Sequence, residues 1–305
     1  MRTLAADLIG PFAGPEKSSG FEILSVVNDD FTIGAGRYYV DGILCENEKE
    51  KVTYLEQEDY PNPTAPNTNT AYLVYLDVWE RHITVLEDDN IREKALGGPD
   101  TATRTKVVWQ VKIDDGMRGT PDNLDLSSAV AVRKNWKNWI ALWQPSHLGC
   151  LKARVNRPED SNDPCLTAPD AKYRGAENQL YRVEIHKGGG AGEATFKWSR
   201  DNGAIVTSCE LSGVDLTVHN PRGFVANQWV ELTNEGQELR GEYGTLVKLL
   251  KVESEVLTLA SAPSPDIPIP GDEKWPTKVR RWDQNEKGGD LFEKGEVQVK
   301  EGDWI

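Results

Sequence analysis

Oxygen ligands suited to a metal ion gather in the stretch Glu159–Asp163, which reads EDSND. Asp160, Asn162 and Asp163 would supply the carboxylate and amide oxygens that calcium prefers. The stretch lacks, however, the glycine at the sixth position and the closing glutamate of an EF-hand loop. We therefore expect a solvated loop here, with calcium bound by these three residues as the weaker alternative.

The glycine-rich stretch Gly188–Gly192 could cradle a phosphate group. A phosphate-binding loop of the P-loop type needs Lys followed by Ser or Thr, and then a helix. Here the next residues have a strand pattern instead. The stretch is therefore predicted to be the flexible tip of a hairpin that holds no ligand.

Histidine and cysteine are too scattered to indicate a zinc site. The residues concerned are His82, His147, His186 and His219, and Cys45, Cys150, Cys165 and Cys209. No two histidines have ligand spacing, and no CxxC pair is present. We expect no metal and no other cofactor. The thiols are expected to be free and buried in a reducing compartment, with a Cys150–Cys165 disulfide as the alternative.

Catalytic signatures are also missing from the sequence. No GxSxG nucleophile elbow is present. The 49 acidic residues include pairs that could act as the acid and base of a glycosidase, but spacing in sequence does not give separation in space. We expect a protein that is not an enzyme, and we assign no catalytic residue.

The elements that would position these residues are mostly strands, and the clearest pattern lies in Tyr173–Val206. Tyr181, Val183 and Ile185 alternate with polar residues, so we expect them to face the core of the protein. In the strand that follows the glycine-rich stretch, we expect Trp198 to point toward the core. Together the strands form a β-meander.

The second turn of this meander is predicted at Asp201-Asn202-Gly203. Asn-Gly favours a two-residue turn in which both residues have positive φ. We expect the side chain of Asp201 to accept backbone N–H groups within the turn. The chain then returns as a third strand through Ile205.

Further strands and one helix are predicted outside the meander. Asp41-Gly42 is a hairpin signal, and Val107–Ile113 alternates with Trp109 on its buried face. A short helix packed on a sheet is predicted from three tryptophans at helical spacing, Trp136, Trp139 and Trp143.

The predicted fold is mostly β, with antiparallel sheets and meanders, a small β-barrel-like unit and one or two short helices. We divide the chain into a short helix and linker at 1–20 that belongs to a larger unit, an N-terminal antiparallel β domain at 21–126, a Trp-rich helix and connection at 127–150, a central β-meander at 151–212, a small barrel-like unit at 213–262, and a Pro-rich spacer with C-terminal strands at 263–305.

Composition and charge narrow the range of partners. Thirty-five basic and 49 acidic residues give a net charge of −14, which repels a phosphate backbone and an anionic membrane. The one basic pair that stands out is Arg280-Arg281. No run of eighteen apolar residues occurs, and the first residues are too acidic for a secretory leader. We expect no nucleic-acid partner, no membrane span, and assembly in the cytoplasm, with release as part of a particle as an option.

Both ends of the sequence are expected to need partners. Leu4 and Leu8 share one face of a helix that is too short to be stable alone. Glu296–Lys300 reads as a strand, and Trp304 and Ile305 begin a return strand that is not completed. Exposed apolar residues and unpaired edges promote association. We therefore expect assembly contacts at Leu4, Leu8, Trp304 and Ile305, made with further chain or by strand addition from another subunit.

Five stretches together resemble an uncharacterised bacterial family. They are YRGAENQLYRVEIH, ATFKWSRDNGAIV, YLVYLDVWERHIT, ALGGPDTATRTKVVWQVK and VRRWD. The similarity covers nearly the whole chain and is to a domain of unknown function associated with contractile injection systems and phage-tail-like particles. It implies a structural or attachment component, such as part of a baseplate or fibre, and no catalytic residues. It also implies that this chain is an internal portion or a shortened relative.

These observations favour a structural component of a larger assembly. Its partners would be other subunits, and the chain is expected to form a homo-oligomer. The first alternative is a carbohydrate-binding adhesin module, in which exposed tryptophans stack on the sugar rings of a surface glycan. The second alternative is a polysaccharide-active enzyme.

Overall fold

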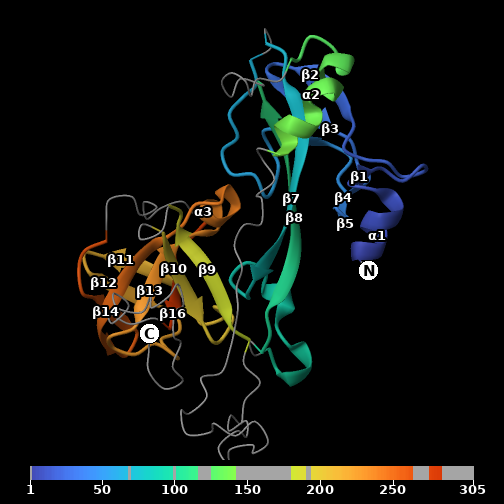
Figure 1. Ribbon diagram of the computed structural model, residues 1–305. Helices are drawn as coiled ribbons and strands as arrows, with labels where there is room; N and C mark the ends of the chain where they lie inside the picture. The colour runs from blue at the N-terminus through green and yellow to red at the C-terminus, as the bar shows by residue number, and fades with distance from the viewer. Residues whose placement is uncertain are drawn as a thin grey trace, which may run out of the picture. The chain divides into compact units, whose positions relative to one another are not determined.

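The computed structural model describes residues 2–67, 70–98, 101–115, 125–141, 180–189, 194–263 and 275–283. In these ranges the protein is mostly β, with antiparallel strand pairs, a closed six-stranded barrel and three short α-helices (Figure 1). The predicted fold class is confirmed. The chain divides into two compact units. The first comprises Met1–Asn67, Leu76–Lys112 and Leu180–Ile305, and the second comprises Thr68–Tyr75 and Ile113–Gln179.

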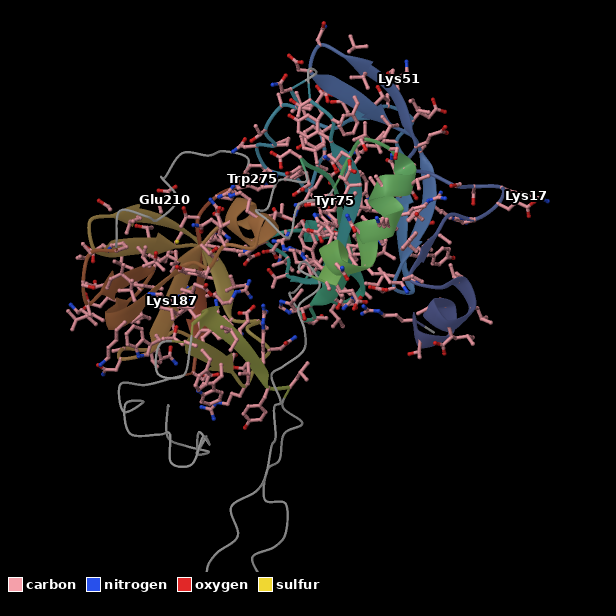
Figure 2. The ribbon with its side chains drawn as sticks, turned by 45° about the horizontal axis from the view of Figure 1, so that its top comes forward. Lys17, Lys51, Tyr75, Lys187, Glu210 and Trp275 are labelled. Atoms are coloured by element: carbon pink, nitrogen blue, oxygen red, sulfur yellow. The ribbon has the colours of Figure 1, made fainter. Side chains whose placement is uncertain are left out.

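The N-terminal part of the first unit combines a short helix with two small sheets. Its elements are α1 (Arg2–Ile9), β1 (Phe12–Ala13), β2 (Ile23–Val27), β3 (Asp30–Ile33), β4 (Gly36–Val40), β5 (Ile43–Asn47) and β6 (Val52–Thr53). The strand orders are β1-β4-β5 and β2-β3-β6. The hairpin turn at Asp41-Gly42 is confirmed, because both residues have positive φ and follow a β4 that pairs with β5. Figure 2 shows Lys17 at the tip of the turn between β1 and β2.

The long strands β7 (Leu73–Ile83) and β8 (Arg104–Asp114) form a separate two-stranded sheet. Between them the chain makes two 3-10 turns, η1 (Asp89–Ile91) and η2 (Lys94–Leu96). Both faces of β8 contain buried residues, because Val111 on the predicted face is 3% exposed and Val108 and Gln110 on the opposite face are fully buried.

Hydrogen bonds hold the polar side chain of Gln110 on the second buried face of β8. Gln110 Nε2 donates to the backbone carbonyls of Asp59 at 2.5 Å and Leu239 at 2.9 Å, whereas its Oε1 has no partner among the described residues. Trp109 is only partly buried, and its Nε1 donates to the carbonyl of Glu46 at 3.0 Å. Alternation of apolar residues alone therefore identifies the strand but not its inner face.

The second unit contains α2 (Ala129–Ala141) together with the beginning of β7. Trp139 is buried, its ring stacks on Trp136 with centroids 5.3 Å apart, and it meets Tyr75 of β7 edge-on at 6.3 Å. The prediction of a helix packed against a strand is thus confirmed through Trp139, and Trp136 lies against Trp139. Trp143 lies outside the described residues.

The closed barrel belongs to the first unit. Its elements are β11 (Val206–Ser212), β12 (Asp215–Val218), β13 (Trp229–Thr233), α3 (Glu235–Arg240), β14 (Thr245–Glu253), β15 (Val256–Leu259) and β16 (Lys278–Trp282). The strand order is β11-β12-β15-β14-β13-β16, and β16 closes the ring by pairing with both β11 and β13. Fully buried leucines fill the interior, among them Leu216, Leu232, Leu249 and Leu257. The barrel therefore extends beyond the predicted range 213–262, because β11 precedes that range and β16 follows it.

The predicted hairpin before the barrel is formed by β9 (Arg182–Lys187) and β10 (Thr195–Ser199). Trp198 is buried as predicted. The predicted core face of β9 is wrong, because its apolar side chains point outward. The exposed fractions are 48% for Tyr181, 45% for Val183 and 67% for Ile185. The alternate, polar residues of β9 turn inward instead. Within the glycine stretch only Gly188 and Gly189 are described.

The turn after β10 lies at Asn202-Gly203, as predicted, with φ of 56° and 66°. The predicted three-stranded meander is wrong, because β10 pairs with β9, whereas β11 pairs with β12 and β16 of the barrel. The role predicted for Asp201 is wrong. Ser199 Oγ accepts the backbone N–H groups of Asp201 and Gly203 at 3.2 and 3.1 Å, whereas the Asp201 carboxylate pairs with Arg281. A serine hydroxyl thus organises the turn and leaves the carboxylate free for an ion pair.

Replacing Asn202 with Val should lower the free energy of unfolding by about 1 kcal/mol or more, because a β-branched side chain is strained at positive φ. Denaturant titration measures the change. Thr217→Val is the matched control, since Thr217 is exposed in the extended strand β12 and should tolerate the substitution. Equal stability of the two variants would contradict the assigned turn.

Candidate functional site

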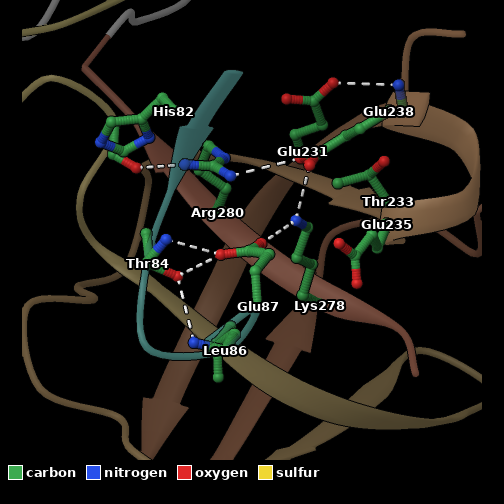
Figure 3. A network of polar contacts seen from close by, with 12 residues as sticks. His82, Thr84, Leu86, Glu87, Glu231, Thr233, Glu235, Glu238, Lys278 and Arg280 are labelled. Atoms are coloured by element: carbon green, nitrogen blue, oxygen red, sulfur yellow. Dashed lines mark hydrogen bonds and ion pairs between the residues drawn. The ribbon is translucent and has the colours of Figure 1, made fainter. Parts of the chain in front are cut away.

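Six charged side chains from three parts of the first unit meet in one network, here called the ion cluster. Figure 3 labels Glu87, Glu235, Glu238, Lys278 and Arg280 of this network. Its members are Arg81 at the end of β7, Glu87 in the following turn, Glu235 and Glu238 on α3, and Lys278 and Arg280 on β16. The three cations are only 3–6% exposed. Buried charges are tolerated when they are paired, so the geometry of this network decides its effect on stability.

Glu238 is the centre of the ion cluster. Its Oε2 atom lies 2.6 Å from Arg81 Nη2 and 2.8 Å from Lys278 Nζ, and its Oε1 atom lies 3.3 Å from Arg280 Nη2. Lys278 also pairs with Glu87, and Arg81 Nη1 lies 2.6 Å from Glu235 Oε1. One carboxylate therefore neutralises cations that come from both β7 and β16.

Local structure fixes the carboxylates in these positions. The short helix α3 is capped at its start by Asn234, whose Oδ1 accepts the backbone N–H of Gln237 at 2.8 Å, and it ends at Gly241 in the left-handed conformation. Glu87 is held by Thr84, whose backbone N–H and hydroxyl both donate to Glu87 Oε2 at 2.7 Å. Figure 3 shows Thr84 and Glu87 joined in this way beside Lys278.

The ion cluster keeps its carboxylates ionised. Burial alone would raise the pKa of Glu238, but the charges of Lys278, Arg280 and Arg81 outweigh it and hold that pKa well below its usual range. At Glu87, burial likewise raises the pKa and the charge of Lys278 lowers it, and the net effect is a lowered pKa. Both side chains are therefore negatively charged at neutral pH.

A second buried ion pair joins β10 to the barrel. Lys197 Nζ lies 2.5 Å from Glu231 Oε1 and 4.7 Å from the ring centroid of Trp282. Trp282 Nε1 and the backbone N–H of Gly244 both donate to Glu231 at 2.9 Å. The side chains of Lys197 and Glu231 are 7% and 5% exposed, so this pair is almost completely removed from water.

A cleft of about 330 Å³ opens beside both groups of charges, and all of its lining residues belong to the first unit. The inward face of β9 contributes Arg182, Glu184 and His186, while His82 comes from β7 and Tyr243 from the segment after α3. Arg182 Nη2 donates to Glu184 at 2.7 Å, and Lys197 Nζ lies 3.4 Å from the same carboxylate. The inverted face of β9 thus forms one wall of a polar cleft.

Both imidazoles of the cleft are kept neutral. Burial, with the charges of Arg280 and Arg182, lowers the pKa of His82 to about 4. Burial, with the charge of Lys197, also lowers the pKa of His186. The cleft therefore combines ionised carboxylates with neutral imidazoles at neutral pH, an arrangement that offers both hydrogen-bond donors and acceptors.

The protein should become less stable as the pH falls from about 6.5 to about 4. In this window the unfolded state binds a proton at His82 and the folded state does not, so stability rises with pH. We expect a loss on the order of 1–2 kcal/mol, after allowance for the partial exposure of the ring. Urea titrations at several pH values measure it. His82→Gln should reduce the loss in this window to the part due to His186, whose pKa is also lowered, and leave the further loss below about pH 4.3, where unfolded carboxylates take up protons. An unchanged slope would contradict the assignment.

The structure describes only two of the residues predicted to carry sites, Leu4 and Leu8. Asp160, Asn162 and Asp163, and the terminal Trp304 and Ile305, lie outside the described residues. Leu4 and Leu8 of α1 are 61% and 77% exposed. Neither Leu4 nor Leu8 contributes to the ion cluster or to the cleft.

Two of the four cysteines belong to the described part of the chain. Cys45 and Cys209 are free and buried, and burial raises the pKa of each thiol to about 12. This agrees with the prediction for these two residues. Within the described ranges, no group of three His, Cys, Asp or Glu residues could hold a metal ion.

Sequence reasoning missed the buried cations. Arg280-Arg281 is the basic pair that stands out in the sequence, but both side chains are buried and ion-paired, so this pair presents no surface to phosphate. No local signal marks Lys278, Arg280 and Lys197 as buried, because successive residues of a strand point to opposite faces and a charged residue beside an apolar one is the ordinary pattern of a half-buried strand.

Comparison with known proteins gives one match. Residues 1–141 and 139–305 match the profile of a family described as a family of unknown function (DUF6519). No curated protein and no solved structure matches the chain. Among the helices of the described ranges, none has the length and apolar character needed to span a membrane.

Proposed function

The chain belongs to this family of unknown function, DUF6519, and from that premise we propose that it is a structural or attachment subunit of a larger protein assembly. The resemblance given above supports a contractile injection system or phage-tail-like particle as that assembly. In this proposal the role is not catalytic, and several copies of the chain assemble in the cytoplasm. The exposed strand β2 carries the proposal.

β2 has the properties of an interface strand. It is an outer strand of the sheet β2-β3-β6, and all five of its residues are exposed. Its apolar side chains are 37–62% exposed, namely Ile23, Leu24, Val26 and Val27. The neighbouring β3 buries Phe31 and Ile33, so the core of this sheet does not need β2 side chains. An apolar edge strand of this kind readily accepts a strand from another chain.

A second copy of the chain is a partner that fits β2. The strand reads ILSVV and carries no charge, so two antiparallel copies of β2 can pair without placing like charges opposite each other. Such a contact is isologous and closes a two-fold dimer. Elsewhere the net charge of −14 opposes close approach of two copies, which makes an uncharged strand the favourable place for contact.

Sedimentation velocity of the full chain over a range of concentrations tests the proposal. We expect the wild type to self-associate and the double variant Leu24→Lys, Val26→Lys to sediment as a monomer, because charged side chains on an edge strand block pairing. Leu96→Lys is the matched control, since Leu96 is 70% exposed in η2, away from the sheet. A wild type that stays monomeric, or a double variant that associates as strongly as the control, would contradict the role of β2.

A further inference from the structure

The cleft beside β9 has a lining that suits one class of ligand. Its volume of about 330 Å³ lies within the range of small-molecule sites. Four Lys or Arg residues and five Glu residues line it, so their charges nearly cancel. A nearly balanced lining favours neither an anion nor a cation, and this density of charge disfavours an apolar ligand. An uncharged ligand rich in polar groups fits the lining best.

Two imidazoles of the cleft have unused hydrogen-bonding capacity. Among the described residues, His82 Nε2 and His186 Nδ1 are buried and have no partner. Arg182 Nη1 lies 3.4 Å from His82 Nδ1 and can only donate, so Nδ1 accepts and Nε2 carries the proton of the neutral ring. A buried donor without a partner is unfavourable, and a ligand oxygen would satisfy it.

Tyr243 adds an aromatic surface at the cleft. Its side chain is 57% exposed, and its ring is held edge-on against His186 with centroids 4.9 Å apart. Nearby, Glu184 is fixed by Arg182 and Lys197, and a carboxylate with two such partners can still accept from a further hydroxyl. An aromatic face beside fixed acceptors and donors is complementary to a sugar ring, which has an apolar C–H face and hydroxyls around its edge.

We propose that this cleft binds an uncharged sugar residue, with its ring against Tyr243 and its hydroxyls on His82, His186 and Glu184. A hydroxyl both donates and accepts, so it meets the mixed requirements of neutral imidazoles and an ionised carboxylate. The sugar site does not depend on pairing through β2, because no residue of β2 lines the cleft.

An array of neutral and acidic glycans probed with the full chain tests this proposal, followed by calorimetric titration with the neutral glycans that are retained. We expect binding to neutral glycans, and about a tenfold loss of affinity in Tyr243→Ala and in His186→Ala. Phe12→Ala is the control, because Phe12 is a similarly exposed aromatic residue on β1. Its affinity should equal that of the wild type. Unfolding curves of Tyr243→Ala should match the wild type, since this side chain is largely exposed.

Three results would overturn the proposal. The first is an array on which no neutral glycan is retained. The second is retention of acidic glycans alone, which would show that the cations of the cleft are available to an anion. The third is equal affinity of Tyr243→Ala and wild type, which would place any bound sugar elsewhere on the protein.

Discussion

Replacing Glu238 with Ala should lower the free energy of unfolding by about 3–5 kcal/mol, because it removes one partner of a buried ionic network. Arg81, Lys278 and Arg280 would then have to share the two remaining carboxylates of the ion cluster. Arg280 would lose its only carboxylate partner within that cluster. Denaturant titration at pH 7 measures the change.

Glu242→Ala is the matched control for this experiment. Glu242 follows the same helix and forms two hydrogen bonds of 2.8 Å with Arg240, but its side chain is 50% exposed. Exposed pairs of this kind contribute about 1 kcal/mol or less. The Glu238 side chain is itself 24% exposed, so a loss of similar size in both variants would show that solvent screens its ion pairs and that the cluster does not act as a buried network.

Replacing Lys197 with Ala should have an effect of similar size, about 3–5 kcal/mol, for a related reason. Glu231 would remain buried, with only the N–H groups of Trp282 and Gly244 as partners from these contacts. The substitution also removes the cation from the face of Trp282. Thermal and chemical unfolding both report the loss.

A double-mutant cycle separates the charge from the packing of Lys197. Lys197→Met retains most of the side-chain volume, and Glu231→Gln removes the negative charge. If the two charges interact directly, the double variant should be more stable than the sum of the single losses predicts. Additive losses would mean that the 2.5 Å contact contributes little and that each residue acts through other neighbours.

The sequence predicts individual strands well because apolar alternation and turn residues are local signals. Asp41-Gly42 and Asn202-Gly203 both form the predicted turns, since Asp, Asn and Gly tolerate the positive φ that such turns need. The tryptophans of α2 are likewise found on one face. Each of these features depends on a few neighbouring residues.

The cleft could not be predicted, because it depends on pairings between distant segments. The alternation in β9 gives two faces, and an apolar face normally points to the core. Here Lys197, Glu231 and Arg280 supply a polar environment that only the folded chain brings together, and β9 turns its charged face toward it. The side chains that line the cleft come from segments around residues 80, 184, 240 and 280, and no local spacing records their proximity.

The closure of the barrel by β16 also sets an order of events during synthesis. Pairing of β11 and β13 with β16 is completed only after Lys278–Trp282 has been made, although β15 ends at Leu259. At translation rates of about 5–20 residues per second, the roughly 20 intervening residues take about 1–4 s. During that time β11 and β13 each have an edge that is not paired with β16, and Glu87 and Glu238 have no ion pair with Lys278. In this interval the unpaired strand edges of the nascent chain are therefore most prone to pair wrongly with other nascent chains on the same mRNA.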